Sequence, residues 1–307
     1  MEIAIFVSHP EQYRGCDLSD YSFTYGDAQN NGVYHAYETV QKLLMKYDKT
    51  KFDQLYFGSE FCENLIPTIE ELKFFLNKCK ADGLGPVFVT PVVTDRGIAK
   101  LKVCFDFLDA QGVMYSTVVN DVGVLQMLSE CAKTKSVIIG RLFDKTSHDS
   151  RISQKDIPSY YGAAGIRYAG EPGILSDHSR RILKSFGVQR FEFDLPKVGI
   201  YPDRREDYGF SLYWPFHYLT TGRVCLFRAA DREGKDKFLV GGKPCRGICK
   251  KKELELRKPV NGFSPEQGVK KNDLYLFQKG NTIFYLYDHN DLEALISRFD
   301  RVIIQVL

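Results

Sequence analysis

Apolar strand-like runs alternate with amphipathic helical patterns over the first two thirds of the 307-residue chain, and this alternation constrains the fold most strongly. The strand-like runs are Ile3–Val7, Phe52–Phe57, Pro86–Val93, Val113–Val119, Ser136–Leu142 and Val188–Phe193. The helical patterns are Gly32–Tyr47, Pro67–Lys80, Gly97–Ala110, Val124–Lys133 and Ile174–Phe186. Strands that alternate with helices predict crossover units and a parallel sheet, and this many units fit a closed barrel better than an open sheet. We therefore expect the α/β class, as an irregular (β/α) TIM-like barrel.

The turn after the first strand argues against a nucleotide-binding sheet. Such a sheet needs a glycine-rich turn at this point, whereas Val7 to Glu11 read VSHPE.

The pattern changes after residue 208, where an aromatic strand, Phe210–Phe216, precedes polar, glycine-rich and charged stretches. We expect residues 1–208 to form the main part of the barrel. Residues 209–272 would hold the aromatic strand and a loop-rich, cysteine-containing insertion. Residues 273–307 would supply closing strands and a helix that return to the barrel.

Charge and cysteine content set the expected environment. The formal net charge is +3, from 42 Lys and Arg against 39 Asp and Glu, so no strong general affinity for nucleic acid is expected. The dense basic run Lys250–Lys252, with Arg246 nearby, is either a solvated turn or a contact for RNA. No apolar run approaches the ~18–20 residues that span a bilayer. Eight cysteines and no signal-peptide pattern at the start indicate a reducing compartment, and we expect a cytoplasmic protein.

Three cysteines lie close together in the insertion. Cys245 and Cys249 are four residues apart, and Cys225 lies twenty residues before Cys245. Soft thiolates select zinc or an iron–sulfur cluster. A single such pair, without a second short pair, is also compatible with ordinary buried cysteines. The residues alone leave these alternatives open.

Several segments resemble one known family. Ser211–Cys225 (SLYWPFHYLTTGRVC) and Pro244–Cys249 (PCRGIC) resemble the cluster-binding region of the U-32 peptidase family. Further segments that resemble the family are Leu55–Cys62 (LYFGSEFC), Val119–Leu125 (VNDVGVL) and Gly187–Pro196. The chain is most similar to the short iron–sulfur members that act in anaerobic ubiquinone hydroxylation. It departs from them in a longer polar loop before Cys245 and a basic segment after Cys249.

The resemblance implies a cofactor and an activity. It implies a 4Fe-4S cluster, with zinc as the alternative, held by Cys62, Cys225, Cys245 and Cys249. It also implies an enzyme of oxygen-independent hydroxylation, or an accessory subunit, that works alone or with a homologous partner chain. The substrate would be a small biosynthetic molecule or RNA. A peptidase and a non-catalytic scaffold with a structural thiolate site are the alternatives, although neither the H-E-x-x-H nor the G-x-S-x-G motif is present.

Polar residues at predicted strand ends are the other candidates, because barrel active sites lie at these ends. Asn120 and Asp121 either cap the following helix or face a substrate. Glu192 shares one strand face with Asp194, since side chains alternate with period two. These three, Asn120, Asp121 and Glu192, are the catalytic candidates. Arg96 and Arg141 are candidates for binding an anionic substrate.

Overall fold

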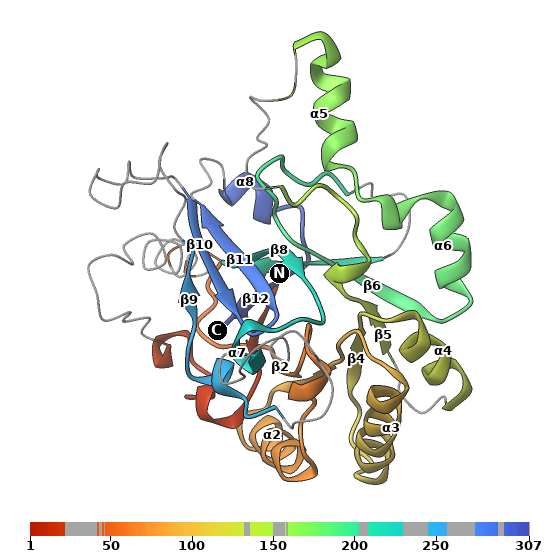
Figure 1. The fold of residues 1–307 in the computed structure, drawn as a ribbon, viewed down its shortest axis with the longest axis vertical. Coiled ribbons are helices and arrows are strands. Elements are labelled where there is room, and N and C mark those ends of the chain that lie inside the picture. Colours follow the sequence, from red (N-terminus) through yellow and green to blue (C-terminus); the bar gives the residue numbers. More distant parts are fainter. Residues whose placement is uncertain are drawn as a thin grey trace.

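Eight parallel strands close into a barrel in the computed structural model of the chain (Figure 1). The structure describes residues 1–21, 42, 45, 47–131, 136–149, 157, 159–202, 208–229, 245–256, 274–287 and 292–306. The order around the barrel is β1-β12-β7-β6-β5-β4-β3-β2. The barrel strands are β1 (Glu2–Val7), β2 (Gln54–Gly58), β3 (Gly85–Val89), β4 (Ser116–Val119), β5 (Ser136–Ile139), β6 (Val188–Phe193), β7 (Gly209–Trp214) and β12 (Arg301–Gln305). The predicted TIM-like barrel is confirmed.

Helices connect most of these strands on the outside of the barrel (Figure 1). Within the described part of the chain they are α2 (Ile69–Asp82), α3 (Asp95–Ala110), α4 (Val122–Cys131), α5 (Gly162–Gly170), α6 (Asp177–Lys184), α7 (Leu226–Ala229) and α8 (Leu292–Ile296). Of the predicted helix Gly32–Tyr47, only residues 42, 45 and 47 belong to the described residues. Among those that the structure covers, no helix is both long and apolar enough to cross a bilayer.

The barrel strands are apolar on both faces, which explains their near-continuous hydrophobic runs. In β1, Ile3 and Ile5 belong to the large core between the strands and the helices. The alternate residues Ala4 and Phe6 belong to a second core with Tyr56 and Tyr213 from other strands. Because successive side chains point to opposite faces of a strand, this second core fills the barrel interior.

A smaller antiparallel sheet accompanies the barrel. Its strand order is β8-β11-β10-β9. These strands are β8 (His217–Thr221), β9 (Leu254–Glu255), β10 (Leu274–Lys279) and β11 (Thr282–Tyr287). Phe61, just after barrel strand β2, packs its ring against Tyr218 of β8 at 5.5 Å and Phe284 of β11 at 5.4 Å. The small sheet therefore packs on the loop that follows β2.

The region after residue 208 is organised differently from a simple insertion. The aromatic strand is barrel strand β7, paired with β6 and β12. Of the closing strands expected within residues 273–307, β10 and β11 join the small sheet rather than the barrel. Only β12 returns to the barrel, where it pairs with β1 and β7. Residues 230–244 and 257–273 of the insertion lie outside the described residues.

Candidate functional site

Cys62 lies at the end of the barrel where the strands terminate. β2 ends at Gly58, whose φ of +123° favours glycine. A Cβ at this position would lie 2.3 Å from the backbone oxygen of Val89, so only glycine fits without displacement. Ser59 then closes a short loop, because its hydroxyl donates to the Cys62 carbonyl at 2.7 Å. The sequence of this turn thus holds Cys62 at the barrel mouth, where active sites of such barrels lie.

The three late cysteines come from two further segments. Cys225 immediately precedes α7. Cys245 and Cys249 flank Gly247, whose φ of +66° turns the backbone into the helical turn Ile248–Lys250. Cys249 interacts electrostatically with Cys62, Cys225 and Cys245, and Cys62 interacts with Cys225 and Cys245. The structure therefore brings the four predicted ligand cysteines together, and we call this set the thiol cluster.

The remaining described cysteines with assigned burial lie elsewhere. Cys79 and Cys104 are buried in the core between strands and helices, and Cys16 packs at its edge. Their role is that of small apolar side chains.

Hydrogen-bond donors surround the thiol cluster. Gly247 donates its backbone N–H to Cys245 Sγ at 3.5 Å, and Asn64 Nδ2 lies 3.9 Å from Cys62 Sγ. Backbone groups of Phe227 and Arg228 hydrogen-bond to Cys225. Such donors stabilise the thiolate form, which is the form that binds metals.

Burial, in contrast, favours the neutral form of the same thiols. Burial raises the pKa of Cys62 and of Cys225, and the neighbouring thiols add to this rise. Burial together with the three other cysteines raises the pKa of Cys249 to about 11. Burial and the neighbouring thiols thus both favour the protonated forms of Cys62, Cys225 and Cys249, and a metal that binds them must displace protons.

A small cavity of about 70 Å³ lies between Cys62 and Cys249. Its apolar wall includes Phe6, Phe61, Leu65, Phe284 and Val306, and its polar wall includes Ser8, Glu60, Lys250, Lys279 and Gln305. Gly280, at the turn between β10 and β11, completes the wall, and a Cβ there would lie 3.4 Å from Cys249 Sγ. Among the described residues, no group of three or more His, Cys, Asp or Glu side chains is placed to hold a single metal ion.

Arg141 is fully buried at the barrel mouth, and internal partners occupy its whole guanidinium group. Glu60 accepts two of its hydrogen bonds, at 2.7 and 2.8 Å. The other acceptors are Asp194, the Phe216 carbonyl and Gln305. A guanidinium has five N–H donors, and these five contacts use them. Arg141 therefore has no donor left for an anionic substrate, and its position serves the internal network.

The charged groups around Arg141 shift one another's pKa values. Burial raises the pKa of Asp194, but Arg141, His217 and His148 together outweigh burial and hold that pKa below its usual range. His148 lies beside this pair, with Nδ1 3.7 Å from Asp194 Oδ2 and its ring 4.4 Å from that of Tyr218. Burial lowers the pKa of His148, which keeps it neutral near pH 7.

Asn120 and Asp121 take local structural roles. Asn120 is buried and donates to the Thr90 carbonyl at 3.0 Å. Asp121 accepts hydrogen bonds from the backbone of Gly123 at 2.7 Å and of Val93 at 3.2 Å. Asp121 thus caps the start of α4, which is one of the two roles expected for it. Arg96 is exposed in the first turn of α3.

Glu192 is buried inside the barrel. It accepts hydrogen bonds from the hydroxyls of Tyr56 at 2.8 Å and Tyr213 at 2.9 Å. Burial raises its pKa to about 7, although both hydroxyls oppose the rise. Asp194 contacts Arg141 in the same interior, so the two carboxylates share the predicted face.

Three residues of this region, Glu60, His148 and Lys279, were not identified from the sequence. Glu60 follows a strand end, the same signal that singled out Arg141, and it could have been found. His148 and Lys279 carried no such signal, because their neighbours in space come from remote segments. The basic run at Lys250–Lys252 is partly neutralised, since Lys250 pairs with Glu71 at 3.1 Å.

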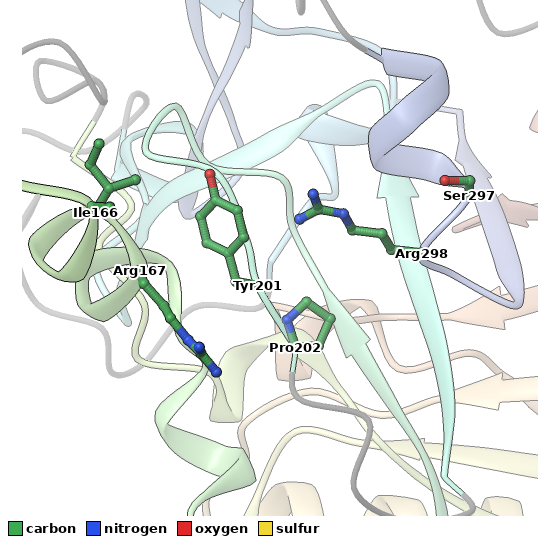
Figure 2. A pocket seen from close by; sticks show the side chains of 7 residues that line it. Ile166, Arg167, Tyr201, Pro202, Ser297 and Arg298 are labelled. Atoms are coloured by element: carbon green, nitrogen blue, oxygen red, sulfur yellow. The ribbon is translucent and has the colours of Figure 1, made fainter.

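A second cavity, of about 730 Å³, contains none of these residues. It lies between α5 and the segment that follows α8, and Figure 2 shows Arg298 reaching toward the ring of Tyr201. The guanidinium carbon of Arg298 is 5.2 Å from that ring's centre.

Comparisons with known proteins add little to this description. No protein-family model matches the chain, and no curated protein matches it. A solved structure described as "The Structure of the U32 Peptidase Mk0906" aligns over 100% of this chain and 93% of its own, with a TM-score of 0.39 and 11% sequence identity. At these values the similarity supports no conclusion about function.

Proposed function

We propose that this chain is an iron–sulfur protein in which Cys62, Cys225, Cys245 and Cys249 bind a 4Fe-4S cluster. The observation that carries the proposal is the thiol cluster itself. Four cysteines from three separate segments interact electrostatically at the barrel mouth, while Cys79 and Cys104 lie in the outer core. Four Cys thiolates are the usual ligands of such a cluster.

The surroundings of the thiols fit this cofactor. Hydrogen bonds to cluster sulfurs help to set reduction potentials, and N–H donors lie at Cys62, Cys225 and Cys245. Gly280 lies against Cys249, where a Cβ would be 3.4 Å from its Sγ, and a cavity with a partly apolar wall adjoins Cys62 and Cys249. The residues therefore offer four thiol ligands and hydrogen-bond donors beside them.

Zinc is the alternative metal for these thiols. Zn–S bonds of about 2.3 Å require tetrahedral sulfurs roughly 4 Å apart around one ion. In the described part of the chain, no three potential ligands are placed to hold a single ion. Metal analysis of the protein distinguishes zinc from an iron–sulfur cluster.

We propose that the cluster serves an oxygen-independent hydroxylation or a related redox modification. When bound, the cluster supplies one-electron transfer. Around it, Arg141 ties Glu60 to Asp194 and so holds the loop that carries Cys62. The sequence resemblance of Ser211–Cys225 and Pro244–Cys249 supports this activity, a small biosynthetic molecule or RNA as substrate, and a homologous chain as a possible partner.

The test is anaerobic purification followed by iron, sulfide and zinc analysis and an absorption spectrum. We expect about four irons and four sulfides per chain by the stoichiometry of such a cluster. Cys245→Ser should lose them, whereas Cys16→Ser, outside the thiol cluster, should retain them.

Other results would contradict the proposal. Zinc in place of iron, lost equally in Cys245→Ser, would leave a structural thiolate site and a scaffold role. No metal in anaerobically prepared protein would remove the redox function, and a peptide-hydrolysis assay would then test the peptidase alternative.

A further inference from the structure

Lys279 is the last residue of β10, and it lines the cavity between Cys62 and Cys249. It is partly buried, and its charge interacts with Cys249. The neighbouring Gly280 approaches Cys249 so closely that a Cβ would lie 3.4 Å from its Sγ. The β10–β11 turn thus carries a cation to the edge of the thiol cluster.

The charge of Lys279 is not used by a direct partner. Its ammonium makes no hydrogen bond or ion pair with any residue that the structure describes; Glu253 interacts with it only at longer range. Lys250 lines the same cavity, but its Nζ lies 3.1 Å from Glu71 Oε1. Of these two cations, Lys279 is the one without a direct ion pair; burial lowers its pKa, and Glu253 and then Cys249 are the charges that oppose this effect.

We propose that Lys279 is the charge-compensating residue of the thiol cluster and raises the reduction potential of the cofactor bound there. This inference rests on the proposed function. Four thiolates and a cluster form a negatively charged body, and reduction adds one more electron to it. A positive charge close to the cluster stabilises the reduced state more than the oxidised state. The electron comes from an external one-electron reductant, and no covalent bond forms or breaks.

The experiment compares the anaerobically prepared wild type with Lys279→Met, Lys279→Gln, Lys279→Arg and Lys251→Met. Lys251 is the matched control, because it is two residues from Cys249 but is 75% exposed and pairs with Glu11 at 3.7 Å. Each protein is analysed for iron and sulfide and by circular dichroism. It is then titrated with dithionite, and the reduced fraction is followed by absorption and electron paramagnetic resonance.

We expect the two neutral variants to retain the fold and shift the midpoint potential to more negative values. At a fixed potential, the ratio of reduced to oxidised cluster should fall about tenfold, which is 59 mV for one electron. Lys279→Arg and Lys251→Met should stay close to the wild type. Loss of iron from both folded neutral variants, but not from Lys279→Arg, would also support charge compensation.

The failures can be told apart. Wild-type protein without iron and sulfide overturns the proposed function and this inference with it. A wild-type cluster whose potential is the same in Lys279→Met, or which shifts equally in Lys251→Met, overturns the inference and leaves the proposed function standing.

Discussion

Replacing Glu192 by Gln should make the protein more stable at alkaline pH. Glu192 lies inside the barrel between the hydroxyls of Tyr56 and Tyr213, and burial raises its pKa to about 7 from an ordinary value of 4.5. The folded state therefore binds a proton that the unfolded state releases between these two pH values. A group that is protonated only in the folded state makes the free energy of unfolding fall as pH rises through this window.

The size of the effect follows from the two pKa values. One pKa unit corresponds to 1.36 kcal/mol, so the folded protein should lose about 3 kcal/mol of stability between pH 4.5 and pH 7 through Glu192 alone. Glutamine stays neutral, but its single oxygen accepts fewer hydrogen bonds from the tyrosines, at a cost of about 1 kcal/mol. We expect Glu192→Gln to exceed the wild type by about 2 kcal/mol at pH 8 and to show no gain at pH 5.

Urea denaturation at a series of pH values measures this difference. Other groups also titrate in this range, so the quantity of interest is the variant's free energy of unfolding minus that of the wild type. Glu130→Gln, at an exposed position of α4, is the control and should change the profile by less than about 0.5 kcal/mol. A difference that does not grow between pH 5 and pH 8 would refute the assignment of a raised pKa to Glu192.

Two further predictions concern the barrel mouth. Arg141→Met leaves Glu60 and Asp194 buried without their cation, so we expect the free energy of unfolding, measured by urea denaturation, to fall by about 3–5 kcal/mol at pH 7. The loss should be smaller at pH 5, where the carboxylates can be protonated. Arg96→Met, at an exposed position, should be nearly neutral, and equal effects of the two variants would contradict the buried network around Arg141. Gly58→Ala forces a left-handed residue against the Val89 carbonyl and should cost about 1–3 kcal/mol in thermal or urea unfolding. Gly83→Ala, also at positive φ but in open space, should cost less, and the reverse order would show that the contact with Val89 is unimportant.

The barrel could be predicted from the sequence because most of its strands are recognisable from short stretches of the chain. Buried runs such as Ile3–Val7 alternate with helical patterns, and each repeat is readable within its own window. That β7 belongs to the barrel could not be predicted in this way. Between β6 and β7 the described residues contain no helix, so the alternation that identifies a crossover unit is interrupted. Pairing with β6 and β12 assigns β7 to the barrel instead.

Some residues of the candidate site could likewise be identified from the sequence, and others could not. Spacing along the chain could single out Cys225, Cys245 and Cys249, whereas Cys62 entered only through resemblance to a family. The type and strand-end position of Arg141 were also visible, but its partners Glu60, Asp194 and Gln305 follow or end three other strands. Whether an arginine faces a ligand or is saturated by its neighbours depends on atoms that are distant in sequence.

The sequence by itself determined the alternating elements, the glycine at position 58 that the turn after β2 requires, and the types of side chain available at the strand ends. Only the tertiary structure decided which of these side chains meet. It brings Cys62 to three cysteines near the other end of the chain, turns Arg141 inward, and sets Lys279 beside Cys249. The physical reason is that backbone preference and hydrophobic period act over a few residues, while barrel closure joins strand ends that are far apart along the chain.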